Sequence, residues 1–201
     1  EVYTNSPENI FEDGAGHLVM RAIKTNLGTF TSARIKTQGK FAVKYGEIEA
    51  RIKITSGQGM WPAFWMLGDN VDDVGWPKCG EIDIMENIGR EPGTVHGTVH
   101  GPQYSAAHGI TSEASLPAGM ALSNAFHIYA TVWSPKSIEF FLDGRKCAAV
   151  TPDSLPKGAK WVFDHPFFLL LNLAVGGSWP GAPDELSRFP KTMLVDWVRV
   201  W

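Results

Sequence analysis

Residues 80–87 read GEIDIMEN, so that three carboxylates, Glu81, Asp83 and Glu86, fall within six residues. The first two acids alternate with isoleucines, which is the period of a β-strand with one polar face and one buried face. Continued alternation would turn Glu86 toward the buried face, where an unpaired charge is costly. One extra residue in the strand, a β-bulge near Met85, would return Glu86 to the polar face. The sequence therefore predicts a bulged strand with all three acids on one face.

The spacing of the two glutamates suggests cleavage of a glycosidic bond. Four effective steps of ~3.3 Å put the Cα atoms of Glu81 and Glu86 roughly 13 Å apart. Their long side chains can lean together to the ~5–5.5 Å separation of a retaining glycosidase pair. Asp83 would lie between them, hydrogen-bond one glutamate and hold its orientation. Crowded like charges separate their pKa values, so one carboxyl stays protonated as acid while another stays ionised as nucleophile. An edge strand with solvated acids is the alternative.

The composition indicates one soluble domain spanning residues 1–201. With 18 Lys+Arg against 21 Asp+Glu and no basic run, nucleic acid is not expected as a partner. No apolar run approaches the ~20 residues of a membrane span. No charged-then-apolar leader opens the chain, so any signal peptide lies outside these residues. Cys79 is expected to be a small buried residue, with a disulfide to Cys147 as the less favoured alternative.

The elements that must hold these acids are short strands. The 21 Gly, 13 Pro and 8 Trp describe a turn-rich β protein. Residues 1–16 are predicted to be irregular, residues 69–78 form a long loop, and Asp143-Gly144 is a hairpin turn. Strands are predicted over residues 17–23, 30–37, 40–45, 47–54, 60–67, 94–101, 126–133, 137–142, 146–150, 167–175 and 193–201. About a dozen short strands without a long helix predict an all-β, two-sheet antiparallel sandwich.

Four tryptophans are candidates for binding sugar rings. Trp61 and Trp65 are four residues apart on one predicted strand and hence on one face, while apolar residues supply the other face. They either belong to the core or line a cleft; a cleft role is favoured for at least one, with Trp65 the nearer to the acids. Trp76 and Trp179 lie in Gly/Pro-rich loops where no core requires an indole. Exposed loop aromatics often bind ligands, and pyranose faces stack well on them.

The polar candidates near the acids have two interpretations each. His96 and His100 share one face of a predicted strand and could ligate a metal, although no HExxH pattern is present. His100 is expected instead to border the cleft and to hydrogen-bond a carboxylate or a sugar hydroxyl, and His96 fits a structural role equally well. Arg34 is either a solvated surface charge or a clamp for sugar hydroxyls. Asn172, within an apolar run expected to be buried on both sides, either lines the concave face or makes a core hydrogen bond.

The motifs resemble those of a known family. Residues 81–86 (EIDIME) fit the active-site signature of glycoside hydrolase family 16, in the form with an extra residue between the aspartate and the second glutamate. Residues 57–67 (GQGMWPAFWML), 94–102 (TVHGTVHGP) and 172–180 (NLAVGGSWP) resemble the bacterial endo-β-1,3-glucanases, or laminarinases, of that family. The resemblance extends over essentially the whole chain.

The resemblance implies a concanavalin-like β-jelly roll with a concave substrate groove and a retaining double-displacement mechanism that needs no cofactor. Glu81 resembles the nucleophile of the family, Asp83 the helper acid and Glu86 the general acid/base. Five further positions resemble groove residues that contact glucosyl units: Arg34, Trp61, Trp65, His100 and Trp179.

The chain departs from the family pattern at its start. Members of the family usually carry some tens of residues before the segment that resembles residues 1–4, including an outer strand and part of a structural calcium site. Asp196 resembles the calcium aspartate, but its usual N-terminal partners are absent from the sequence. An unpaired sheet edge is the expected consequence.

The resulting hypothesis is a secreted, monomeric endo-β-1,3-glucanase that acts on laminarin-type β-glucan. A mixed-linkage β-1,3-1,4-glucanase is the second substrate hypothesis. A non-catalytic β-glucan-binding module on the same fold is an alternative of a different kind, although a pure binder does not need two glutamates flanking an aspartate. A metal hydrolase that uses His96 and His100 would lose its activity to chelators.

Overall fold

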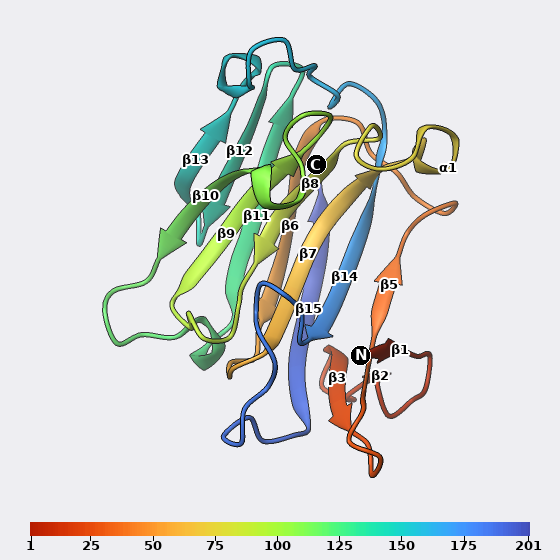
Figure 1. The fold of residues 1–201 in the computed structure, drawn as a ribbon, viewed down its shortest axis with the longest axis vertical. Helices are drawn as coiled ribbons and strands as arrows, with labels where there is room; N and C mark the ends of the chain where they lie inside the picture. Colours follow the sequence, from red (N-terminus) through yellow and green to blue (C-terminus); the bar gives the residue numbers. More distant parts are fainter.

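The computed structural model describes residues 1–201 as two β-sheets packed against each other (Figure 1). The six-stranded sheet has the order β10-β9-β8-β7-β14-β5, and the nine-stranded sheet has the order β1-β4-β3-β15-β6-β11-β12-β13 with β2 paired to β3. All strand pairs are antiparallel apart from the short parallel pair β1–β4. The predicted all-β, two-sheet sandwich is confirmed.

The strands are β1 (Val2–Tyr3), β2 (Ile10–Glu12), β3 (Leu18–Lys24), β4 (Phe30–Ser32), β5 (Arg34–Lys36), β6 (Gly46–Lys53), β7 (Met60–Gly68), β8 (Glu81–Glu86), β9 (Thr94–His100), β10 (Ile110–Ser115), β11 (His127–Ser134), β12 (Ser137–Leu142), β13 (Arg145–Val150), β14 (Phe167–Val175) and β15 (Lys191–Val200). The α-helix α1 (Val71–Val74) and three short 3₁₀ turns complete the structure. None of its helices has the length and hydropathy that crossing a bilayer requires.

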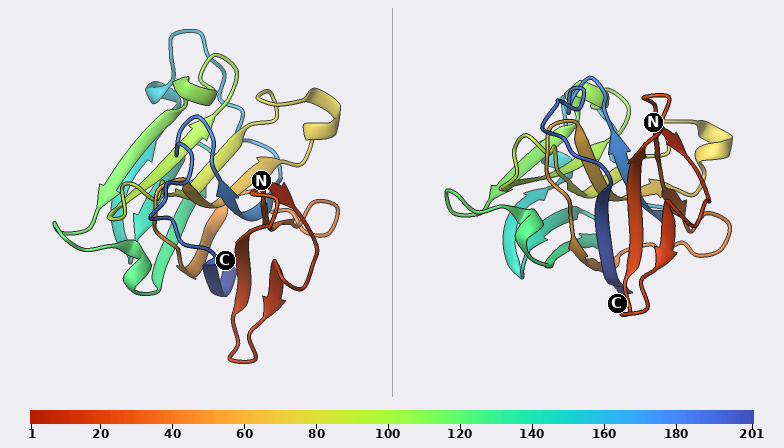
Figure 2. Two further views of the ribbon diagram at one scale, coloured as in Figure 1. Left: turned by 60° about the horizontal axis from the view of Figure 1, so that its bottom comes forward. Right: turned by 90° about the horizontal axis from the view of Figure 1, so that it is seen from below.

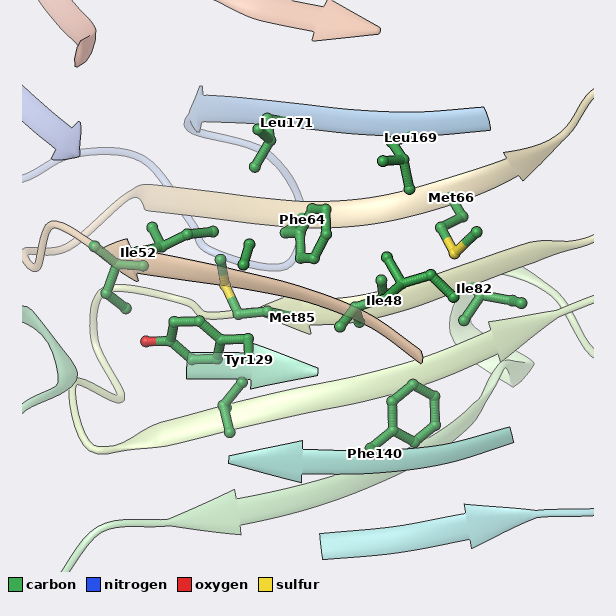
Figure 3. Packing of buried hydrophobic residues seen from close by; sticks show 14 of the residues in the cluster. Ile48, Ile52, Phe64, Met66, Ile82, Met85, Tyr129, Phe140, Leu169 and Leu171 are labelled. Atoms are coloured by element: carbon green, nitrogen blue, oxygen red, sulfur yellow. The ribbon is translucent and has the colours of Figure 1, made fainter. Parts of the chain in front are cut away.

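The core lies between the sheets and is filled by alternate residues of facing strands (Figure 3). On β7 the even-numbered positions, such as Phe64 and Met66, are fully buried, while Trp61 and Trp65 on the opposite face are partly exposed. Each buried Phe or Met contributes about 1.5–3 kcal/mol of transfer free energy. This burial fixes the face of β7 that points away from the core, and with it the side on which Trp61 and Trp65 stand.

The hairpin between β12 and β13 follows the prediction. Asp143 and Gly144 have φ values of 51° and 76°, the two positive angles of a type I′ turn. The turn matches the right-handed twist of the two strands, and the predicted hairpin is confirmed.

The prediction of one strand over residues 30–37 is wrong. The chain leaves the nine-stranded sheet after β4, passes through the buried residue Ala33, and joins the six-stranded sheet as β5. Both sides of the break bind β14, because Ser32 Oγ donates to the carbonyl of Leu173 and the Leu173 N–H donates to Ala33. A change of sheet at such a corner leaves the alternation of the sequence almost intact, so the pattern alone does not reveal it.

Residues 40–45 do not form the predicted strand. Only an isolated bridge joins Val43 to Phe167. Gly39 and Tyr45 have positive φ values of 72° and 67°, so left-handed residues stand on both sides of the bridge and prevent a continuous extended run.

Strands were missed where the pattern is weak. Residues 1–16, predicted to be irregular, contain β1 and β2, which are two and three residues long. The edge strand β10 carries mainly small and polar residues, none of them fully buried.

Part of β15 lacks a second neighbour, although the strand lies inside its sheet. β3 pairs with β15 only over Lys191–Val195, and from Trp197 onward β15 has β6 as its sole neighbour. Figure 2 shows the N-terminal strands beside β15 (red and blue). A cavity of about 510 Å³ lies between the sheets here, lined mainly by apolar side chains of both. Val198, which points into it, is 36 % exposed.

Candidate active site

The strand β8 carries a bulge that places its three acids on one face. Asp83 is opposite Trp65 of β7, but the next pair is Met85 with Phe64, so Ile84 is the extra residue. Ile84 and Met85 are both buried in the core. The pairing with β9 shifts at the same place. The predicted bulge is confirmed, and Glu86 returns to the outer face of the six-stranded sheet, meaning the face turned away from the core.

Strand register brings distant residues to Glu86. One row of paired positions crosses the outer face of all six strands: Arg34 on β5, Asn172 on β14, Ala63 on β7, Glu86 on β8, His96 on β9 and Glu113 on β10. Side chains at paired positions stand on the same face about 4.5–5.5 Å apart. The row therefore joins, around one glutamate, residues from six separate parts of the chain.

Each glutamate accepts a hydrogen bond from an indole. Trp61 Nε1 donates to Glu86 Oε1 at 2.9 Å, and Trp76 Nε1 donates to Glu81 Oε2 at 2.7 Å. Trp65 stands directly opposite Asp83, which fits the prediction that it is the β7 tryptophan nearer to the acids, but its N–H points to the other side and Trp61 makes the hydrogen bond to a carboxylate. Register explains this: the strand opposite Trp65 on that side offers an amide as acceptor.

That amide is Asn172, whose Oδ1 accepts the Trp65 N–H at 2.7 Å. Arg34 lies over the Trp65 ring, with its Cζ 4.6 Å from the centroid. The hydroxyl of Tyr3 also hydrogen-bonds Asn172, and burial raises the pKa of Tyr3. Asn172 is thus a satisfied polar group on the outer face. Sequence reasoning missed Tyr3, because a two-residue strand leaves no recognisable period.

Trp179 joins the site from the loop after β14. Its ring meets that of Trp61 edge-on, with centroids 5.4 Å apart, and that of His96 at 5.0 Å. His96 is 3 % exposed. Its ring nitrogens lie 3.5 Å from a Glu91 oxygen and 3.4 Å from a Glu113 oxygen, and neither contact has hydrogen-bond geometry. His96 therefore lies beneath Trp179 at the β9 side of Glu86.

The three acids all have raised pKa values. Burial raises the pKa of Glu86 to about 7, against the opposing hydrogen bond from Trp61. Burial, followed by the charges of Glu81 and Glu86, raises the pKa of Asp83 well above its usual range. Burial also raises the pKa of Glu81, but hydrogen bonds from Asp83 and Trp76 stabilise its charge. Burial is the largest cause of the raised pKa at all three acids, and Glu86, with a pKa of about 7, is within reach of both protonation states near neutral pH.

His100 borders the acids without a charge of its own. Its Nε2 lies 3.0 Å from Asp83 Oδ2, without hydrogen-bond alignment, and 3.9 Å from Glu81 Oε1. Burial lowers the pKa of His100 to about 4, so its ring is neutral at pH 7. Glu81, Asp83 and His100 offer ligand atoms within 4.8 Å of one another, and they are the one side-chain group in the structure with the makeup of a metal site.

Asp196 does not offer the donor set of a calcium site. Its Oδ2 is 2.5 Å from Arg51 Nη1, and no group of metal-ligating side chains includes it. A guanidinium already neutralises this carboxylate, and calcium requires six to eight oxygen ligands. The cysteines are as predicted: Cys79 is buried, and neither it nor Cys147 forms a disulfide.

The sequence pattern of the family described as "Glycosyl hydrolases family 16" matches residues 2–199. The laminarinase catalytic domain from Thermotoga maritima MSB8 is 48% identical with a TM-score of 0.92, over 98% of this chain and 81% of that one. "Beta-glucanase" from Rhodothermus marinus is 41% identical over 86% of this chain and 62% of its own length. "Glucan endo-1,3-beta-glucosidase A1" from Niallia circulans is 35% identical over 99% of this chain. The chain spans only 31% of that protein.

Proposed function

Because the chain belongs to glycosyl hydrolases family 16, we propose that it hydrolyses internal β-1,3-glucosidic bonds of laminarin-type glucans with retention of anomeric configuration. One observation carries the proposal: two glutamates, each accepting a hydrogen bond from a different indole, share the outer face of β8 with an aspartate between them. The names of the Thermotoga maritima and Niallia circulans proteins support the β-1,3 linkage.

In the first step, an ionised Glu81 oxygen attacks the anomeric carbon and forms a glycosyl ester. The bond from that carbon to the leaving oxygen breaks, and Glu86 gives its proton to that oxygen. Asp83 is the helper acid: its proton on Glu81 keeps the carboxylate oriented. The raised pKa of Glu86, about 7, keeps it protonated under mildly acidic conditions.

In the second step, Glu86 is ionised and takes a proton from an incoming water. The water oxygen bonds to the anomeric carbon, and the ester bond to Glu81 breaks. Two inversions at one carbon give net retention. No step requires a metal or an organic cofactor, and calcium has no role in this mechanism.

The substrate is expected to lie across the outer face of the six-stranded sheet in an open groove. Seven side chains are proposed to contact glucosyl units: Arg34, Trp61, Trp65, Trp76, His100, Asn172 and Trp179. A polymer of this kind does not enter cells, so we expect the protein to be secreted. We also expect it to act as a monomer. Mixed-linkage β-1,3-1,4-glucan is the alternative substrate.

The test is product analysis on laminarin, lichenan and agarose, with Glu81→Gln assayed beside the unaltered protein. Short oligosaccharides should appear from laminarin, and proton NMR should show the β-anomer first. Glu81→Gln should abolish turnover, because an amide keeps the size of the side chain and loses its nucleophilicity, while laminarin binding stays largely intact.

The outcomes separate the hypotheses. Faster release from lichenan than from laminarin would favour the mixed-linkage enzyme. Laminarin binding without products from any glucan would indicate a binding module. Normal turnover in Glu81→Gln would remove Glu81 from the mechanism.

A further inference from the structure

The two indole hydrogen bonds form a matched pair that the sugar-binding role of tryptophan does not explain. We infer that Trp76 and Trp61 are positioning residues, whose N–H groups each hold one oxygen of a glutamate, Glu81 and Glu86 respectively, in place for reaction. The inference rests on the proposed function for its catalytic meaning. It adds a role to side chains that the sequence predicted only as sugar platforms.

Trp61 is placed by β7. Its position is two residues along from Ala63, which stands directly opposite Glu86. A methyl side chain at that point leaves room for the indole to reach the carboxyl from the next position on the same face. The edge-on contact with the Trp179 ring, at 5.4 Å, limits rotation of the indole. The N–H therefore meets Glu86 Oε1 from a supported ring.

Trp76 is placed by the loop that leads into β8. The Cys79 N–H donates to the Gly75 carbonyl at 3.0 Å, and the Gly80 N–H donates to Pro77 at 3.1 Å. These two bonds close a compact turn around Trp76, five residues before the glutamate that its indole contacts. The turn brings the donor to Glu81 although the side chain of Trp76 is 47 % exposed.

The chemistry follows from the donor. An indole N–H can donate a hydrogen bond and cannot accept one. On Glu86 it occupies Oε1 as acceptor, so the acidic proton belongs on Oε2, from which it reaches the leaving oxygen. On Glu81 it stabilises the ionised form that must attack. Each bond thus favours one oxygen and one charge state at its glutamate.

Phenylalanine separates the two roles of tryptophan, since it keeps a ring for stacking and lacks the N–H. The experiment compares Trp76→Phe, Trp61→Phe and the unaltered protein through the pH dependence of kcat/KM on laminarin. Loss of the donor should raise the pKa of Glu81 in Trp76→Phe, which moves the acidic limb to higher pH. It should raise the pKa of Glu86 in Trp61→Phe, which moves the basic limb to higher pH. Each shift should be roughly one pH unit.

Trp65→Phe is the matched control. Its indole N–H bonds the amide oxygen of Asn172 and no carboxylate. Its KM is expected to change, while both limbs of its pH profile stay where they are. Because Trp76 is half exposed, Trp76→Phe should fold, and it decides the inference if Trp61→Phe does not.

A second measurement needs no turnover. Glutamates labelled with ¹³C at the carboxyl carbon are titrated by NMR, with resonances assigned from Glu81→Gln and Glu86→Gln. A higher pKa of Glu81 in Trp76→Phe supports the inference even if the protein hydrolyses no glucan. In that case only the proposed function fails. The inference would be overturned if KM alone changed, while both limbs of the pH profile and the pKa values of Glu81 and Glu86 stayed the same. The indoles would then serve only to bind sugar rings.

Discussion

At the scale of single residues, the environment of each carboxyl decides its role. Glu86 is buried, and its pKa of about 7 reflects burial before any neighbouring charge. Asp83 lies between two glutamates, and its pKa is raised well above its usual range by burial first and by the charges of both neighbours second. Glu81 has two donors that offset its own desolvation. Three chemically similar side chains thereby acquire the distinct tasks of acid, helper and nucleophile.

Asp83→Asn tests the helper role. A protonated aspartate and an asparagine both donate a hydrogen bond, so the variant keeps the contact to Glu81. It loses the charge that Asp83 can take up when the nucleophile is neutralised. We expect a reduction in kcat that is clearly smaller than the loss in Glu81→Gln, measured on laminarin at one pH. Equal losses would give Asp83 a larger part than orientation.

Glu86→Gln should change stability in a pH-dependent way. Glu86 titrates near 4.5 when exposed and at about 7 in the fold. Below pH 4.5 Glu86 is protonated in both the folded and the unfolded protein. Between pH 4.5 and 7 it ionises only in the unfolded protein. Above pH 7 it is ionised in both, and the folded protein carries the full cost of the buried charge. That cost is about 3 kcal/mol.

The variant should therefore melt higher than the unaltered protein at pH 8 and at the same temperature at pH 4. Glu8→Gln, at an exposed position, should alter Tm little at either pH. A Glu86→Gln protein that melts lower at pH 8 would contradict the raised pKa.

At the scale of elements, β8 works because its period is interrupted once. If all six residues of β8 were paired regularly, alternation would turn Glu86 toward the core; the bulge at Ile84 returns it to the outer face opposite Ala63. The bulge also explains why Ile84 and Met85 are both buried, although they are neighbours in sequence that regular strand geometry would place on opposite faces. The backbone conformation at one residue therefore decides whether the two glutamates share a face.

Deletion of Ile84 tests the bulge. Deletion closes the bulge: residues 81, 82, 83, 85 and 86 then alternate regularly, so Met85 stays opposite Phe64 and Glu86 stays on the outer face opposite Ala63. The core loses one buried isoleucine side chain, and we expect Tm to fall by about 5–10 °C, roughly the effect of 2–3 kcal/mol in a domain of this size. Turnover should be reduced but retained, because both glutamates remain on one face. Deletion of Gly119 is the control, because this residue lies in an exposed loop where a Cβ atom would have no neighbouring atom within 4 Å. A folded deletion variant without any turnover would contradict this expectation, because it would mean that catalysis needs the bulge itself and not only a shared face for the glutamates.

At the scale of the whole molecule, the two sheets serve different ends. The six-stranded sheet presents the acids, while the nine-stranded sheet closes the core behind them. The half-paired β15 and the cavity beside it lie away from β8. Arg51 and Asp196 form an ion pair on the nine-stranded sheet. The chemistry and the half-paired strand are therefore features of separate regions.

Metal removal distinguishes the carboxylate mechanism from a metal hydrolase. Glu81, Asp83 and His100 stand close enough to hold an ion, and a mechanism through that ion would stop in excess EDTA. The proton shared by Asp83 and Glu81 explains the same closeness without a metal. We expect kcat on laminarin to remain within error after dialysis against EDTA, with the product pattern unchanged. Loss of turnover restored by added zinc would reverse the assignment.

The sequence by itself determined what depends on neighbours along the chain. Alternation of acid and apolar residues set the outer face of β8, and the misplaced Glu86 required the bulge. The same local rule placed Trp61 with Trp65, and Asp143-Gly144 specified its turn. Each of these follows from backbone geometry over a few residues, which a linear pattern records.

The tertiary structure decided what depends on pairing between distant strands. Register put Trp65 opposite Asp83 but within reach of Asn172, which accepts its N–H, while Trp61 bonds Glu86 and Tyr3 reaches the same amide as Trp65. The change of sheet at Ala33 was invisible because alternation continues through it. Protonation was also beyond the sequence, because burial supplies the largest shift at all three acids and arises only when both sheets and their loops close around them.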